Sequence, residues 1–142
     1  MELDASADQD LVLSIADSWA RLSDRLESGL GSLKGISFAE YRLLRAIADS
    51  PQGRASRVDL AERVHLSASG VTRALIPLQK LGYVESRRSP RDARLTLALL
   101  TAAGEELVAD ASGIVDDIAE SIVGRLPHDT RDTLVTVLTT LT

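Results

Sequence analysis

The sequence contains no cysteine, few aromatic residues and no long apolar run. Without cysteine the chain can form neither a disulfide nor a cysteine-based zinc site, and it cannot use thiolate catalysis. Aromatic residues make up only 3% of the chain, so Leu, Val, Ile and Ala must supply the core, which is typical of helical proteins. No apolar stretch approaches the roughly 18 residues that a membrane span needs. The acidic first ten residues differ from a signal peptide, so we expect a cytoplasmic protein with no membrane partner.

Motifs of catalysis and of metal binding are also missing. The chain has no G-x-S-x-G elbow, no glycine-rich phosphate loop and only two histidines, His65 and His128, far apart in sequence. Asp116, Asp117 and Glu120 can be drawn with His128 as metal ligands, but acidic residues on a helix more often form a solvated face. We therefore expect no enzyme, no metal and no cofactor.

Positive charge is concentrated in the middle of an acidic chain. The 142 residues carry a net charge of −5, and 44% of them are hydrophobic, enough for one domain with helical extensions. Residues 54–94 have a net charge of +5, whereas residues 1–53 carry −4 and residues 95–142 carry −6. This separation favours an anionic partner for the middle segment, and the alternative is a merely solvated charged face.

The N-terminal segment has the apolar spacing of a long helix. Its apolar residues recur at spacings of 3, 4, 3 and 4, and they are Val12, Ile15, Trp19, Leu22 and Leu26. This spacing is typical of helices that pack side by side. Three glycines in residues 29–35 predict a helix end and a loop.

A capping box predicts the next helix. Ser37 with Glu40 has the required spacing, and the helix should run to about Ala48. Phe38 and Tyr41 begin its apolar side. Proline and glycine in residues 49–53 should end it.

Two shorter helices joined by a three- to four-residue turn predict a helix-turn-helix. Ser56 and Asp59 form a looser box before the first, in which we expect Val58, Ala61 and Val64 to point inward and Leu60 to lie at the edge. Ser67 should cap the second, over residues 67–81, and Gly82 should end it. The apolar face expected for this second helix comprises Val71, Ala74, Leu75, Leu78 and Leu81. Pro77 predicts a bend, because it removes the bond to the Arg73 carbonyl.

The period then changes to that of strands. Residues 83–88 and 95–100 each predict a short strand, the second with Leu95, Leu97 and Leu99 inward. Ser-Pro between them favours a turn, so residues 87–94 should form the projecting loop of a β-hairpin.

Two helices are expected after the hairpin. Thr101 is a good N-cap for the first, and Pro127 separates it from the second. The first has an apolar seam at Ala111, Val115, Ile118 and Ile122, and the second has Leu134, Val137, Leu138 and Leu141.

A helix-turn-helix followed by a hairpin is a winged helix, so we expect a mainly α (α+β) fold with a two-stranded wing. In this arrangement the second helix enters the DNA major groove and the wing reaches the backbone or a minor groove. The exposed face of residues 67–81 offers candidate contacts to double-stranded DNA at Ser67, Ser69, Gly70, Thr72 and Arg73. Simple capping is the alternative role for Ser67.

Several segments in order resemble the winged-helix core of the MarR (multiple antibiotic resistance regulator) family. They are "LAERVHLS" (60–67), "VTRALIPLQKLGYVE" (71–85), Asp92 and Arg94 in "RDAR", and "LALLTAAG" (97–104). The chain departs from the family at His65, where glycine is common, so we expect a less tight turn there. The resemblance implies a homodimeric DNA-binding regulator, usually a repressor and often released from its operator by a small ligand.

The resemblance also assigns roles within the wing and the dimer. Arg94 corresponds to the family's minor-groove arginine and Asp92 to its acidic partner, here expected to brace an arginine. Arg87, Arg88 and Arg91 would then contact phosphates. In the family the terminal helices interlock across the dimer, so the expected interface residues are Val12, Ile15, Trp19, Leu22, Val115, Ile118, Ile122 and Leu138. The alternative for each apolar seam is packing within one subunit. The family's usual ligand pocket lies between the dimer helices and the winged helix, where Trp19, Phe38 and Tyr41 are candidates, and the alternative is that they are core residues.

The predicted organisation is a winged helix-turn-helix domain at residues 36–100, flanked by a helical dimerisation region at residues 1–35 and 101–142. The predicted function is a homodimeric, ligand-responsive repressor that reads a pseudo-palindromic site through residues 67–81 and 87–94. The alternative is a helical dimerisation or protein-interaction module that does not bind DNA.

Overall fold

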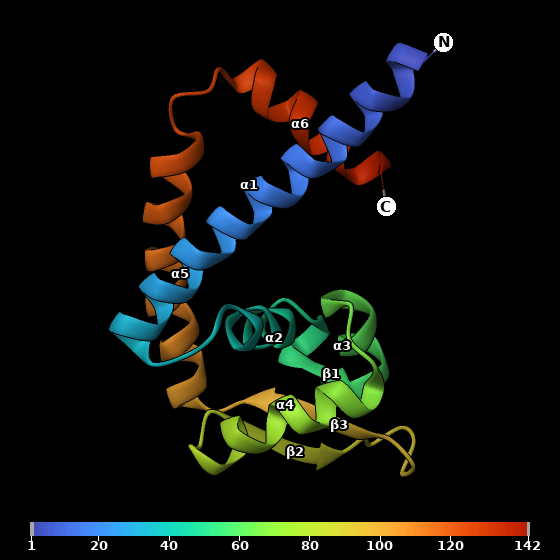
Figure 1. Cartoon of the computed structure of the whole chain (residues 1–142). Coiled ribbons are helices and arrows are strands. Elements are labelled where there is room, and N and C mark those ends of the chain that lie inside the picture. Colours follow the sequence, from blue (N-terminus) through green and yellow to red (C-terminus); the bar gives the residue numbers. More distant parts are fainter. Residues whose placement is uncertain (1, 142) are drawn as a thin grey trace.

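A computed structural model describes residues 2–141, with side chains from residue 6 onward, and shows a mainly helical protein with one small sheet (Figure 1). The helices are α1 (Glu2–Lys34), α2 (Phe38–Ala48), α3 (Arg57–Val64), α4 (Ala68–Lys80), α5 (Ala102–Val123) and α6 (His128–Thr140). The strands are β1 (Arg54–Ser56), β2 (Val84–Arg88) and β3 (Thr96–Leu100), and a short 3₁₀ turn, η1 (Pro51–Gly53), precedes β1. Within the described residues no helix is long and apolar enough to cross a bilayer.

The sheet is antiparallel with the order β1-β3-β2. The predicted hairpin is confirmed, with Val84 opposite Leu100 and Arg88 opposite Thr96. The third strand, β1, was not predicted, because three residues between two helices carry too little alternation to be recognised. It pairs Ala55 with Ala98 of β3, and both side chains are buried. The mainly α winged-helix class is confirmed.

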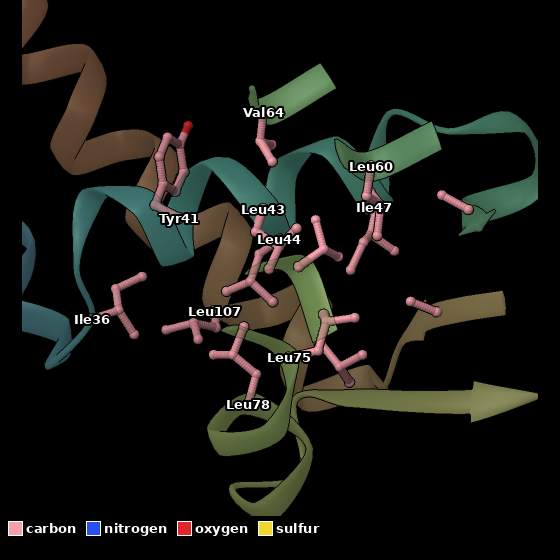
Figure 2. Packing of buried hydrophobic residues seen from close by; sticks show 14 of the residues in the cluster. Ile36, Tyr41, Leu43, Leu44, Ile47, Leu60, Val64, Leu75, Leu78 and Leu107 are labelled. Atoms are coloured by element: carbon pink, nitrogen blue, oxygen red, sulfur yellow. The ribbon is translucent and has the colours of Figure 1, made fainter. Parts of the chain in front are cut away.

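The core lies where α2, α3, α4 and the start of α5 meet one face of the sheet. Figure 2 shows Leu44 and Ile47 of α2, Leu60 of α3, Leu75 of α4 and Leu107 of α5 converging on this volume. All but Leu107 are completely buried, and Leu107 is nearly so. Because each helix contributes to one shared core, α3 and α4 are fixed relative to the wing.

Local capping signals confirm four predicted helix starts. The hydroxyls of Ser37, Ser56, Ser67 and Thr101 each accept a hydrogen bond from the backbone N–H three residues later, at 3.0 to 3.1 Å. The Glu40 carboxylate accepts a bond from the Ser37 N–H at 3.0 Å, which completes the capping box.

The first helix ends within residues 29–35 as predicted, but α1 continues to Lys34, so the predicted loop is shorter than expected. A Cβ at position 29 would lie 2.6 Å from Cδ1 of Ile118, so glycine here allows α1 to approach α5 closely. Leu30 is fully buried one residue later. Packing therefore outweighs the low helix propensity of glycine, and Gly35, with φ of +68°, ends the helix instead.

The predicted inward faces of the short helices were partly wrong. Leu60 is fully buried and Val58 is 58% exposed, the reverse of the expected arrangement. In α4, Val71, Leu75 and Leu78 are buried as predicted, whereas Leu81 is exposed beyond the last turn. With only eight residues, α3 offers too few apolar positions to define its phase from sequence.

The predicted phase of the second strand was also wrong. Ala98 faces the core and Leu100 packs against it, while Leu95 is exposed and Leu97 and Leu99 are only partly covered. The small Ala98 fits because the neighbouring β1 presents Ala55 beside it. The alternation of leucines alone therefore predicted the wrong buried face for β3.

The turn between α3 and α4 is tight despite the histidine. His65 adopts the left-handed conformation with φ of 55° and ψ of 43°, the region that glycine favours. Its N–H bonds to the Ala61 carbonyl, and α4 begins three residues later. The expectation of a looser turn was therefore wrong. Pro77 lies inside the continuous α4 helix, and the bend stays a prediction.

Candidate nucleic-acid interface

The N-terminal end of α4 presents small polar residues to solvent. The Ser67 hydroxyl accepts from the Gly70 N–H at 3.0 Å and lies 3.2 Å from the Ser69 hydroxyl. A Cβ at Gly70 would come within 3.1 Å of the Ser67 hydroxyl, so glycine keeps this cap unobstructed. Ser67 therefore has the capping role, and its contact with DNA stays a prediction.

Arg73 is the long basic side chain in the N-terminal half of α4. Arg73 is exposed, and none of the ion pairs among the side chains of residues 6–141 involves it. The Thr72 hydroxyl, half-buried, donates to the Ala68 carbonyl at 3.1 Å. Val71 and Leu75 pack the opposite face of α4 into the core, so the backbone at Arg73 is held in place while its side chain is exposed to solvent.

The wing loop is held by hydrogen bonds of its own. The Ser89 hydroxyl accepts from the N–H groups of Arg91 and Asp92, both at 3.3 Å. The Ser89 N–H donates to the Leu95 carbonyl at 2.9 Å, and the Leu95 N–H donates to the Asp92 carbonyl at 3.0 Å. These bonds close the loop into a defined turn that projects beyond the sheet (Figure 1).

Asp92 contacts Arg94 through both backbone and side chain. Its Oδ1 accepts from the Arg94 N–H at 3.0 Å and lies 3.5 Å from the Arg94 Nε. The Arg94 side chain nevertheless remains 93% exposed. This geometry agrees with the predicted brace, and it leaves the guanidinium available to a partner.

The other wing arginines differ in their surroundings. Arg87 forms an ion pair with Glu85 on the same strand, Nη2 to Oε1 at 2.6 Å. Arg88 and Arg91 are exposed. A phosphate contact by Arg87 would therefore require it to leave or share its carboxylate, whereas Arg88 and Arg91 carry no such cost.

Sequence reasoning missed two arginines of the basic segment that lie beside the wing. Arg54 in β1 and Arg57 at the start of α3 each line a surface hollow together with a wing arginine. The sequence offered only their charge as a signal, because their position beside the wing depends on the pairing of β1 with β3.

The three candidate pocket aromatics lie in a row. The ring centroids of Trp19 and Phe38 are 6.2 Å apart, and those of Phe38 and Tyr41 are 6.3 Å apart. Tyr41 is almost fully buried, and its hydroxyl lies 3.1 Å from the Ser112 hydroxyl and accepts from Arg45 at 3.2 Å. This bond and the charge interaction with Tyr41 raise the pKa of Arg45 above its ordinary value.

A large apolar cleft of about 620 Å³ lies between α1, the end of α5 and α6. Its lining includes Trp19 but neither Phe38 nor Tyr41. The residues around it are Ser14, Ile15, Ser18, Trp19, Leu22, Val123, Leu134 and Leu138. The three aromatics therefore do not enclose one pocket within this chain, and Tyr41 belongs to the core.

The predicted dimer residues fall into two groups. Val12, Ile15, Trp19 and Leu138 are exposed, with Trp19 at 53% and Leu138 at 52%, and Leu22 is half-buried beside them. Val115, Ile118 and Ile122 are half-buried, and Ile118 packs against Gly29 of its own chain. The first group is the more exposed of the two, and the dimer role of both groups stays a prediction.

Comparison with known proteins identifies the family. A sequence model of the MarR family matches residues 34–95. The transcriptional regulator HosA of Escherichia coli O111:H- is 30% identical over 100 residues, which cover 70% of this chain and 73% of HosA. The chain belongs to the MarR family. The uncharacterized HTH-type transcriptional regulator YdgJ of Bacillus subtilis strain 168 is 30% identical over 104 residues, 73% of this chain, but the match spans only 62% of YdgJ.

Solved structures agree with this membership. Sco3205, a MarR family transcriptional regulator from Streptomyces coelicolor solved in complex with DNA, matches with a TM-score of 0.88 and 25% identity over 94% of this chain and 84% of Sco3205. A mutant of MarR from E. coli, complexed with operator DNA, matches with a TM-score of 0.82 over 93% of each chain. At 24% identity it supports the fold alone. The predicted family is confirmed.

Proposed function

We propose that this MarR-family protein is a homodimeric transcriptional repressor that binds a pseudo-palindromic DNA site. Each protomer inserts the N-terminal half of α4 into a major groove and places its wing along the flanking backbone and minor groove. The main observation behind the proposal is that Arg94 of the wing is exposed and is held by Asp92 of the same loop. The N-terminal end of α4 also presents small polar residues to solvent. Sco3205, a MarR-family regulator of the same fold that was solved in complex with DNA, supports DNA binding by this chain.

The contacts divide by chemistry. Ser67, Ser69 and Gly70 lie where backbone N–H groups and the positive end of the α4 dipole favour a phosphate. Arg73 reaches from the same face toward base edges or a phosphate. Arg94 enters the minor groove, and Arg88 and Arg91 contact phosphates, joined by Arg87 when it leaves Glu85.

The apolar cleft supports the homodimer. A cleft of about 620 Å³ lined by Ile15, Trp19, Leu22 and Leu138 is an unusual surface for a monomer of this size. We propose that the corresponding helices of a second copy fill it, which matches the interlocked terminal helices of the family. A two-fold dimer then sets the two α4 helices one helical turn apart, about 10 bp on the DNA.

We also propose that a small molecule releases the protein from DNA. The aromatic row of Trp19, Phe38 and Tyr41 connects α1 to α2, so a ligand seated beside it in the dimer could change the angle between the dimerisation helices and the winged helix.

The alternative is a helical interaction module whose winged helix does not bind DNA. The two hypotheses separate in a fluorescence anisotropy titration of the protein with the promoter DNA of its own gene and of the neighbouring gene. The proposed function predicts binding whose logarithmic affinity falls linearly with the logarithm of the salt concentration. Absence of binding at low salt, or affinity that does not change with salt, would support the alternative.

A further inference from the structure

The wing faces a second set of arginines across a short surface groove. Arg57, at the start of α3, and Arg94, in the wing, line one hollow of about 320 Å³. Arg54, in β1, and Arg91, in the wing, line another hollow of about 230 Å³. Each hollow thus has one arginine from the β1–α3 junction and one from the wing.

These hollows contain no carboxylate in their lining. The remaining walls of the first are Ser56, Val58, Leu95 and Thr96, and those of the second include Gln52, Ser89, Pro90 and Leu97. Asp59 and Glu62 line a different hollow, which Arg54 also lines. Asp92 lies close by, and it binds Arg94 without covering it. Guanidinium groups gathered in this way repel one another unless an anion lies between them.

Arg54 adds a second observation. Its Nε atom is buried and has no hydrogen-bond partner among the described residues. A buried donor without a hydrogen-bond partner destabilises the folded protein, and a charged donor does so more than a neutral one. An anion that enters the hollow beside Arg54 and Arg91 would offset part of this cost by drawing the guanidinium into a bonded arrangement.

The shape of the surface favours an extended anion over a small one. The two hollows share no lining residue, but both are lined by the same two segments, since Arg54 and Arg57 are three residues apart at the β1–α3 junction and Arg91 and Arg94 are three residues apart in the wing. A chain of phosphates can occupy both hollows in turn, whereas a single small anion occupies one.

We propose that the β1–α3 junction and the wing are the two walls of a groove that holds one stretch of the DNA sugar–phosphate backbone. Arg54 and Arg57 form one wall, and Arg91 and Arg94 form the other. This rests on the proposed DNA-binding function and extends the contact surface beyond α4 and the wing. Arg94 serves both parts, because it lines the groove while its exposed guanidinium extends toward the minor groove.

The test is the salt dependence of DNA binding by Arg57→Gln and Arg54→Gln, measured by anisotropy between about 50 and about 200 mM salt, a range in which phosphate contacts change affinity strongly. Each variant should lose about two phosphate contacts per dimer, so the slope of log affinity against log salt should fall by about 1.8. Affinity at low salt should fall about tenfold. Hydroxyl-radical footprints should lose protection of the backbone beside the wing.

Matched variants separate the groove from general charge and from folding. Arg125→Gln removes the same charge from the exposed connection between α5 and α6, far from the wing (Figure 1), and should keep the wild-type slope. Arg57→Lys, which retains the charge, should restore most of the slope. Thermal unfolding of Arg57→Gln should match the wild type, so this variant decides the matter even if Arg54→Gln folds poorly.

The outcomes distinguish the groove from the function on which it rests. If the wild type binds DNA and Arg57→Gln keeps both its slope and its footprint, the groove proposal is wrong and the proposed function stands. If Arg57→Gln loses affinity for free inorganic phosphate but not for DNA, the site takes a small anion and the proposal is likewise overturned. Failure of the wild type to bind DNA removes the proposed function and the groove together.

Discussion

Asp92 holds Arg94 at two points, accepting the Arg94 backbone N–H at 3.0 Å while the same Oδ1 lies 3.5 Å from the Nε. The backbone bond shapes the wing turn, and the side-chain contact orients a guanidinium that stays 93% exposed. A carboxylate so close to the proposed DNA path repels phosphate, so its presence is reasonable only if the order that it imposes contributes more than the repulsion costs.

Substitutions of Asp92 can separate two opposing effects on DNA affinity: the repulsion of phosphate by its charge and the ordering of the wing turn by its hydrogen bond. Asp92→Asn keeps an oxygen acceptor for the Arg94 N–H and removes the charge, so DNA affinity should be unchanged or higher. Asp92→Ala removes both, and affinity should fall about threefold to tenfold because the turn loses its brace. Anisotropy titrations at one salt concentration compare the two. Tighter binding by Asp92→Ala would mean that Asp92 acts only as a repelling charge.

Arg94 and Arg91 should differ in their contributions. Arg94→Ala should weaken operator binding by about 1 to 3 kcal/mol, because it removes the minor-groove contact as well as a charge. Arg91→Ala removes a phosphate contact and should cost less. Both side chains are exposed, so thermal unfolding and the oligomeric state should not change. Equal and negligible losses of DNA affinity in both variants would show that the wing loop is a solvated surface loop that does not contact DNA.

Gly104 should be essential for the junction between the wing sheet and α5. A Cβ at this position would clash with the backbone carbonyl oxygen of Tyr83, which cannot move without disturbing the start of β2. Gly104→Ala should therefore destabilise the protein by about 1 to 3 kcal/mol in urea unfolding. Gly113→Ala is the control in the same helix, because its added Cβ meets no atom within 4 Å. It should be neutral or stabilising by up to about 1 kcal/mol.

The apolar cleft should control assembly. Leu138 lines it and is 52% exposed, so Leu138→Asp would be almost neutral in a monomer but should break a dimer. Sedimentation velocity should show the wild type as a dimer and this variant shifted to a monomer at micromolar concentration. Leu81→Asp is the control, because Leu81 is similarly exposed but lies outside the cleft. A wild type that sediments as a monomer would contradict the homodimer.

Local signals predicted the helix starts because each depends on residues three positions apart. Ser37, Ser67 and Thr101 could be read directly, and the hairpin followed from its period and its Ser-Pro turn. The order of these elements, with the resemblance to the family, was sufficient for the winged helix. Arg94 and Asp92 could be paired from sequence because they are neighbours in one loop.

Features that depend on tertiary packing could not be predicted. The extension of α1 through Gly29 requires Ile118 of α5, and the burial of Ala98 requires Ala55 of an unpredicted strand. Arg54 and Arg57 belong beside the wing only once β1 pairs with β3. The same limit applies to the cleft, whose walls come from helices at opposite ends of the sequence.

Selection of bound sequences from a random pool of double-stranded DNA tests the central proposal most directly. The operator sequence need not be known in advance, and the selected pool reports sequence, symmetry and spacing together. A two-fold dimer that inserts two α4 helices into DNA should enrich a pseudo-palindrome whose half-sites are centred about 10 bp apart. Enrichment should be lost for Arg73→Ala, which removes the long basic side chain in the N-terminal half of α4. A pool that shows no enrichment, or an enriched site without two-fold symmetry, would contradict the account.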